Sequence, residues 1–244
     1  LKLNVRADWG FSNKAIDYRP ILNGEDRRDI LYMGLKNYAL NSGKDETYAV
    51  NYADNNIDKY AAKPWSGYTD WEDVLFRNGS HQNYEVNAQG GNERTKFYTS
   101  FGYTKQEGIT LQSGYERITG RANMSHKADR VTIEASTMFT NSTQNVNSEG
   151  TSFSSPIMCL AMTASPSTIP YNEDGTFSTS FPALNGANPL QTATYNYDRS
   201  TIVRTLNTLS ATWNIWDNLN IKETLGYDFN QTNNRVWWYP RSND

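Results

Sequence analysis

The chain is dominated by segments in which apolar and polar residues alternate. From Asn83 to Met124 almost every second residue is apolar or aromatic. Successive side chains of a β-strand point to opposite faces, so this pattern gives each strand one face that avoids water and one that seeks it. Similar stretches predict about seven strands, near residues 3–11, 82–90, 96–105, 116–125, 131–141, 202–215 and 219–232.

The connections between these strands alternate in length. Two are long, near residues 12–81 and 142–201, one is of middle length, near 108–114, and three are tight turns, at 90–93, 126–130 and 216–218. Short turns at one end and long loops at the other are typical of outer-membrane barrels. The predicted fold class is all-β. It is an antiparallel up-and-down meander that forms part of a large transmembrane β-barrel, with short helices in long extracellular loops.

The predicted apolar faces carry aromatic residues toward both ends of the strands. Those at the long-loop end are Trp9, Phe11, Phe101, Tyr103, Phe139, Tyr227 and Phe229, and two more, Trp213 and Trp216, flank a short turn. Aromatic girdles at both edges of an apolar band are expected at the two membrane interfaces. A soluble sheet with one apolar face would also favour aromatic residues in its strands, so the pattern leaves that alternative open.

Two polar residues fall on the strand face that is predicted to contact lipid. Glu223 falls between Ile221 and Leu225 on the predicted apolar face of the last strand, and Asn207 is a milder exception on the strand before it. An acid that faces lipid is unfavourable, although less so near an interface, and a β-bulge would redirect it.

Composition excludes some classes of protein and permits others. Mean hydropathy is −0.75 and 37% of residues are hydrophobic, and no apolar run approaches the roughly 20 residues of a membrane helix. A transmembrane barrel shows lipid only alternate strand residues, so it remains compatible with this composition. The net charge of −3, without a Lys/Arg cluster, argues against a nucleic-acid partner.

No catalytic or metal-binding arrangement stands out in the sequence. The single cysteine, Cys159, cannot form an internal disulfide, and His81 and His126 have no ligand spacing around them. The sequence contains no phosphate loop, nucleophile elbow or metal motif. We therefore predict that the chain is not an enzyme and that it holds no cofactor and no metal.

Acidic residues occur in two places that could suggest ligand chemistry. Asp70, Glu72 and Asp73 could suggest glycoside hydrolysis, which needs two acids that flank the substrate. They lie on one predicted helical turn, however, where the helix dipole favours acids. The Asn/Asp-rich segment 171–176 lacks the full ligand spacing of a calcium loop, so turn chemistry is favoured there and calcium binding near 172–175 is left open.

The long loops are predicted to contain short helices. One begins at Asn23–Asp26, which resembles a capping box and precedes an apolar helical stripe of Ile30, Leu31, Gly34, Leu35 and Tyr38. A second begins at Thr69–Glu72, which is a better capping box. A third begins at Ser155–Pro156, where a proline follows an N-cap serine.

Several segments resemble SusC/RagA-type TonB-dependent outer-membrane transporters. They are Thr69–Ile109, Tyr115–Asp129, Ser165–Phe177 with the following Asn188–Leu190, and Leu219–Asn230. Together they cover most of the chain in the family's order. The Thr-Asp-Trp element that begins at Thr69 and the Gly-Gly-Asn-Glu element that begins at Gly90 are fairly specific in combination. The departure is one of extent, because the family's N-terminal plug and TonB-contacting segment are missing and Leu1 falls about where its barrel begins.

The resemblance implies that residues 1–244 are a partial TonB-dependent-receptor β-barrel, the N-terminal third of the barrel. It implies import of a bulky nutrient, such as a glycan or peptide, across the outer membrane of a Bacteroidetes-type bacterium. The implied partners are outer-membrane lipid, a SusD-like surface lipoprotein, TonB acting through the absent plug, and an oligosaccharide or peptide substrate. Large outer-membrane transporters have about 22 strands, so seven strands cannot close a lumen and should not transport anything alone.

Two sets of residues are candidates for functional contacts. The first, the aromatic residues of the loops, could stack on sugars or peptides or could pack the loops together: Trp65, Tyr68, Tyr171, Tyr195, Tyr197, Trp237, Trp238 and Tyr239. The second, charged residues on the polar strand faces, should point into the lumen and meet the plug or the substrate: Arg6, Asp8, Arg121, Glu134, Lys222 and Asp228.

The alternative function is a self-contained β-rich glycan-binding or adhesin module. Such a module would be soluble without detergent. An enzyme would need two carboxylates in one cleft, and the sequence nominates no such pair.

Overall fold

The chain forms two compact units. The computed structural model describes residues 1–16, 22–61, 69–147, 164–179 and 188–240. The first unit, which we call the sheet, consists of Leu1–Asn13, Asn78–Val146 and Asp198–Val236. The second unit, which we call the loop unit, contains the remaining segments.

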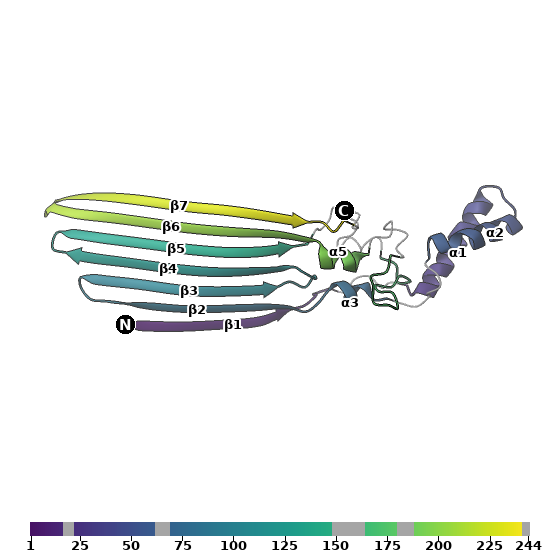
Figure 1. Cartoon of the computed structure of the whole chain (residues 1–244), viewed down its shortest axis with the longest axis horizontal. Coiled ribbons are helices and arrows are strands. Elements are labelled where there is room, and N and C mark those ends of the chain that lie inside the picture. Colours follow the sequence, from purple (N-terminus) through teal and green to yellow (C-terminus); the bar gives the residue numbers. More distant parts are fainter. Residues whose placement is uncertain (17–21, 62–68, 148–163, 180–187, 241–244) are drawn as a thin grey trace. The chain divides into compact units, whose positions relative to one another are not determined.

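The sheet contains seven strands whose spatial order follows the chain (Figure 1). The strands are β1 (Lys2–Ser12), β2 (Gly79–Gly91), β3 (Thr95–Glu107), β4 (Gly114–Ala128), β5 (Val131–Val146), β6 (Tyr197–Trp216) and β7 (Leu219–Trp237). The pairs from β1–β2 to β5–β6 are antiparallel, and β6 is hydrogen-bonded to β7. The predicted up-and-down meander is confirmed.

The strands extend further toward the long connections than the sequence predicts. β5 continues to Val146, β6 begins at Tyr197, and β7 ends at Trp237. The added residues are largely polar, so they lack the apolar alternation from which strands are read. They are nevertheless paired, because Val146 lies opposite Asp198 in the β5–β6 ladder. Tyr197 is therefore a strand residue, and the prediction that it lies in a loop is wrong.

The tight turn between β2 and β3 follows from its residue types. The side-chain oxygen of Asn92 accepts hydrogen bonds from the backbone N–H groups of Arg94 (2.9 Å) and Thr95 (2.8 Å). Gly91 has a φ of 153°, and a Cβ at this position would lie 2.2 Å from the Thr95 carbonyl oxygen. The turn therefore needs both the asparagine side chain and a glycine without a Cβ.

The register places apolar residues opposite apolar residues across the sheet. Val5 lies opposite Val86, and Val86 lies opposite Phe101. Opposed residues share a face, so one side of the sheet is apolar from strand to strand. This apolar face is uncovered in the described part of the chain, where Val5 is 73% exposed and Leu225 62% exposed. A sheet face of this kind requires another apolar layer.

The hydrophobic core that the described residues form lies in the loop unit, not under the sheet. Its buried apolar side chains are Ala39, Ala49, Ala53, Ile57, Ala61, Trp71, Leu75, Leu190 and Ala193. The helices of this unit are α1 (Gly24–Asn41), α2 (Glu46–Asn56), the 3-10 helix η1 (Ile57–Lys59), α3 (Trp71–Leu75) and α5 (Pro189–Tyr195). None of the helices in the described ranges is long and apolar enough to cross a membrane.

The predicted start of α1 is confirmed, but its predicted apolar stripe is not the buried face. The Asn23 side chain accepts a hydrogen bond from the Asp26 backbone N–H at 2.8 Å. Ile30 and Tyr38 of the stripe are exposed, whereas Ala39 is buried. The buried residues that α1 and α2 contribute are small, which allows the two helices to approach closely. The predicted helix after Ser155 lies outside the described residues.

Candidate functional site

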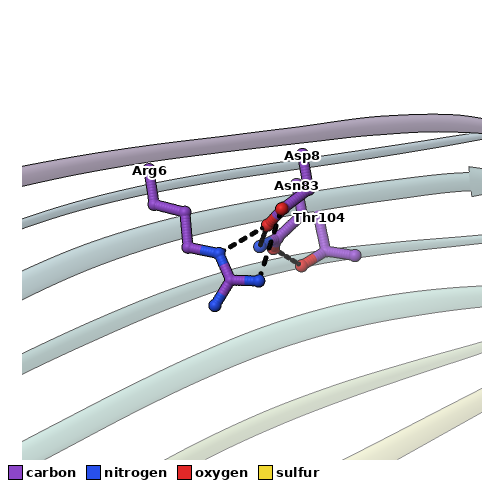
Figure 2. Close-up of polar contacts among 4 residues, drawn as sticks. All are labelled: Arg6, Asp8, Asn83 and Thr104. Atoms are coloured by element: carbon purple, nitrogen blue, oxygen red, sulfur yellow. Dashed lines mark hydrogen bonds and ion pairs between the residues drawn. The ribbon is translucent and has the colours of Figure 1, made fainter.

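The polar face of the sheet carries a hydrogen-bonded network across β1, β2 and β3 (Figure 2). Arg6 Nε lies 2.8 Å from Asp8 Oδ2. Asn83 Nδ2 donates to the same Asp8 oxygen at 3.4 Å, and the Thr104 hydroxyl donates to Asn83 Oδ1 at 2.9 Å. Asp8, Asn83 and Thr104 are direct register partners, so the network follows one row of the ladder. Arg6 and Asp8 therefore lie on one face, and the neutral side chains of Asn83 and Thr104 continue their hydrogen-bonded network.

Two ion pairs continue this face over β5, β6 and β7. Lys222 Nζ lies 3.3 Å from Glu134 Oε2, which also accepts a hydrogen bond from the Ser210 hydroxyl at 3.3 Å. Arg204 binds Asp228 through two hydrogen bonds, Nη2 to Oδ2 at 2.7 Å and Nε to Oδ1 at 3.2 Å. Arg204 is missing from the sequence-based set, although its parity on β6 already assigns it to the polar side.

A groove of about 550 Å³ lies on this polar face over β3 to β7. Three of the predicted lumen-facing residues line it, namely Arg121, Glu134 and Lys222, and Lys96 joins them. The other three, Arg6, Asp8 and Asp228, share the face but do not line the groove. Glu134 is already paired with Lys222, whereas Lys96 and Arg121 have no ion-pair partner among the described residues. The groove is therefore net positive and suits a ligand with hydrogen-bond acceptors.

Three of the predicted ligand-contact residues form one aromatic cluster in the loop unit. The ring centroids of Tyr171 and Phe177 lie 5.2 Å apart, those of Phe177 and Tyr195 5.5 Å, and those of Tyr195 and Tyr239 4.9 Å. Phe177, absent from the sequence-based set, joins Tyr171 to Tyr195, and Tyr195 in turn contacts Tyr239. The geometry supports the alternative in which these residues pack the loops together, although Tyr171 and Tyr195 remain partly exposed.

The other aromatic candidates are placed differently. Tyr197 begins β6 and Trp237 ends β7. Together with Trp238 they are 40–51% exposed. Trp65 and Tyr68 lie outside the described residues.

The cluster is held by Asn188, which is 1% exposed. Its Oδ1 accepts hydrogen bonds from the backbone N–H groups of Leu190 (3.0 Å) and Gln191 (3.4 Å), which caps α5. Its Nδ2 donates to the carbonyl oxygens of Pro170 (2.8 Å) and Ser178 (3.0 Å). One buried side chain thus ties the start of a helix to both ends of the segment that carries Tyr171 and Phe177.

The Thr-Asp-Trp element docks on the same part of the loop unit. Trp71 Nε1 donates to the Ser165 carbonyl oxygen at 3.0 Å, and the Thr69 backbone N–H donates to the Pro166 carbonyl oxygen at 2.8 Å. Asp70 caps α3 by accepting hydrogen bonds from two backbone N–H groups. Two separate segments on which the family resemblance rests, those that begin at Thr69 and at Ser165, are therefore hydrogen-bonded to each other.

Three acidic residues of the loop unit, Asp70, Glu72 and Asp174, have structural partners. Asp70 is a helix cap, and Glu72 forms an ion pair with Lys14. Asp174 accepts hydrogen bonds from the hydroxyl and the backbone N–H of Thr176, and these bonds hold the pKa of its carboxyl below the ordinary value. The described residues contain no group of three or more His, Cys, Asp or Glu side chains that could hold a metal ion. Segment 171–176 is thus organised as a turn.

Comparison with known proteins identifies relatives in sequence and in fold. The chain is 24% identical over 205 residues to TonB-dependent receptor P3 of Formosa agariphila, an alignment that covers 76% of this chain and 20% of the receptor. It is 33% identical over 67 residues to TonB-dependent receptor SusC of Bacteroides thetaiotaomicron, covering 28% of this chain and 7% of SusC. The resemblance to SusC/RagA-type TonB-dependent receptors is confirmed.

The fold comparison covers nearly the whole chain. The RagAB peptide importer in its closed-closed state superposes with a TM-score of 0.65 at 18% identity, over 98% of this chain and 29% of that chain. The RagAB peptide transporter gives a TM-score of 0.65 at 16% identity. The predicted fold class, a meander that forms part of a SusC/RagA-type barrel, is confirmed. This chain spans about a fifth of the length of receptor P3. No family model matches the sequence.

Proposed function

We propose that this chain is part of the barrel wall of a TonB-dependent outer-membrane transporter. The observation that carries the proposal is the uncovered apolar face, continuous over the strands, opposite a face of ion pairs and hydrogen bonds. Lipid supplies the missing apolar layer, and the polar face lines the lumen. The receptor relatives and the fold of the RagAB neighbours support this assignment.

The strand lengths fit this position. A tilted transmembrane strand needs about 9–11 residues to cross the hydrocarbon core. β1 has 11 residues, whereas β6 has 20 and β7 has 19. β6 and β7 therefore extend past the apolar band at their long-loop end, so Tyr197 and Trp237 lie beyond the hydrocarbon core. Glu223 lies near the opposite end, a few residues after the short turn that precedes β7, where an acid costs least.

The open edges of the sheet define what this chain can do. β1 and β7 are the outermost strands, and each has an edge that is unpaired in the described residues. A transmembrane sheet must close because lipid cannot satisfy backbone hydrogen bonds. Large outer-membrane transporters close with about 22 strands, so further strands complete this wall. Transport is a property of the closed barrel.

The cargo proposed for the closed barrel is a bulky nutrient, either a glycan fragment or a peptide. A SusD-like surface lipoprotein is the proposed partner, and TonB supplies energy through a plug. The likeness to RagAB, which is a peptide importer, and the relation to SusC support this assignment. The acids Asp70 and Glu72 already act as a helix cap and an ion-pair partner, which supports a transporter without enzymatic activity.

Adjacent residues on opposite faces provide the test. In the full-length transporter with Cys159 changed to serine, Ser100→Cys and Phe101→Cys place a thiol on the polar and the apolar face of β3, respectively. We expect a small charged thiol reagent to label the Ser100→Cys protein in outer membranes and to leave the Phe101→Cys protein unlabelled. A lipid-soluble maleimide should label the second thiol, which shows that it is reactive. Equal labelling of both thiols by the charged reagent would instead favour the soluble glycan-binding or adhesin module.

A further inference from the structure

The apolar face of the sheet contains a hollow of about 570 Å³ over β3 to β7. Its floor consists of small or short side chains, including Ala122, Ala135 and Thr137. Larger side chains, among them Met124 and Leu209, rise around it. No charged residue lines the hollow, so it favours an uncharged group.

The register explains why a hollow forms at this place. Met124 lies opposite Ala135, and Ala135 lies opposite Leu209. A methyl group on β5 therefore stands between two long side chains on the neighbouring strands. Strands are about 4.8 Å apart, so Met124 and Leu209 stand on strands about 10 Å from each other. An α-helix is about 10–12 Å across, so it cannot enter between these side chains, whereas a single hydrocarbon chain can.

A polar pair lies on the floor of this hollow. The Thr137 hydroxyl donates to Asn207 Oδ1 at 2.6 Å, and the two residues are direct register partners. The bond satisfies the side-chain carbonyl of Asn207 but leaves its amide N–H groups without an acceptor among the described residues. A polar group in hydrocarbon costs free energy when it is not hydrogen-bonded. Asn207 therefore favours an occupant that brings an acceptor oxygen.

We propose that this hollow binds one acyl chain of an outer-membrane lipid, with an ester or hydroxyl oxygen of that lipid accepting a hydrogen bond from Asn207. The inference rests on the proposed function, because the hollow is continuous with the wall assigned to lipid. The shape, the absence of charged lining residues and the unmet Asn207 amide favour this ligand. Asn207, which looks misplaced on a lipid-facing strand, becomes part of a specific site.

The test compares lipid retained by three variants of the full-length transporter after detergent exchange. Ala135→Phe fills the hollow, Asn207→Leu removes the donor at similar volume, and Ala7→Phe adds the same aromatic ring on the apolar face of β1 as a control. Mass spectrometry of the intact complexes should find one tightly held lipid in the wild type and in Ala7→Phe. We expect at least a tenfold lower lipid-bound fraction in the other two variants.

Wild-type retention in either Ala135→Phe or Asn207→Leu would overturn the proposal. So would self-association of the wild type that Ala135→Phe abolishes without loss of lipid, because the occupant would then be a second copy of the chain. Heat-modifiable mobility on gels confirms that each variant is folded. If retention is unaffected while the charged reagent still distinguishes Ser100→Cys from Phe101→Cys, only the lipid site is refuted and the barrel wall stands.

Discussion

Replacing Asn188 by alanine should loosen the aromatic cluster and leave the strands intact. The substitution removes the α5 cap, worth about 1 kcal/mol. It also removes the Asn188 donor from the carbonyl oxygen of Ser178, at about 1–3 kcal/mol for a buried group that stays unsatisfied, whereas the Pro170 carbonyl keeps a hydrogen bond from the Ser178 backbone N–H at 3.1 Å. Together with the lost cap, the total is about 3 kcal/mol. Local opening of residues 164–179 and 188–195 should then become roughly 100-fold more frequent.

Hydrogen–deuterium exchange on the full-length protein measures this opening directly. The amides that Asn188 organises, such as those of Thr192 and Ser178, should exchange about 100 times faster in Asn188→Ala. Amides in β3 and β4 should be unchanged. Asn188→Asp separates the two contributions, because it keeps the cap oxygen but turns a carboxylate toward two carbonyl oxygens. We expect faster exchange in Asn188→Asp as well, and wild-type rates in both variants would refute the reasoning.

Three further changes test other parts of the molecule. Trp71→Phe keeps most of the buried ring but loses its hydrogen bond to a backbone carbonyl, so local opening measured by protease cleavage of the loop unit should rise about fivefold to tenfold, equivalent to about 1–1.5 kcal/mol. Gly91→Ala places a methyl group against the Thr95 carbonyl, so we expect a lower yield of folded protein on a heat-modifiability gel. An alanine substituted at an exposed strand position should leave this yield unchanged. The lowered pKa of Asp174 means that its bonds to Thr176 stabilise the turn above the ordinary aspartate pKa and are lost as pH falls through the lowered value. The protection factor of the Thr176 amide, which is the exchange rate corrected for its intrinsic pH dependence, should therefore fall at acidic pH, and a pH-independent protection factor in the wild type would contradict this.

The sheet can be read from the sequence because its signals are local. Period-two alternation places each strand, and the Asn92 turn with Gly91 sets the β2–β3 hairpin within a few residues. The extensions of β6 and β7 cannot be read in this way. Their polar residues, such as Arg199 bonded to Asn145 at 2.8 Å, are held by a neighbouring strand rather than by an apolar face.

The loop unit is harder to predict because its contacts join distant segments. Trp71 and Ser165 are far apart in sequence, and nothing local in either segment indicates the bond between them. The Asn188 cap precedes a helix of 7 residues, too short to show helical periodicity. Phe177 lies in a segment used for the resemblance. Its place opposite Tyr171 across a turn is the signal that could have made it a candidate contact residue.

The alternation of tight turns and long connections has a consequence for how the molecule can vary. Three hairpins, β2–β3, β4–β5 and β6–β7, are joined by tight turns, and the ladders β1–β2 and β5–β6 are joined through the long segments. The entropic cost of closing a loop rises only about 0.6 kcal/mol when its length doubles. Insertions in the long segments are therefore nearly neutral for strand pairing. The strand register can thus persist while the long segments diverge in length and sequence.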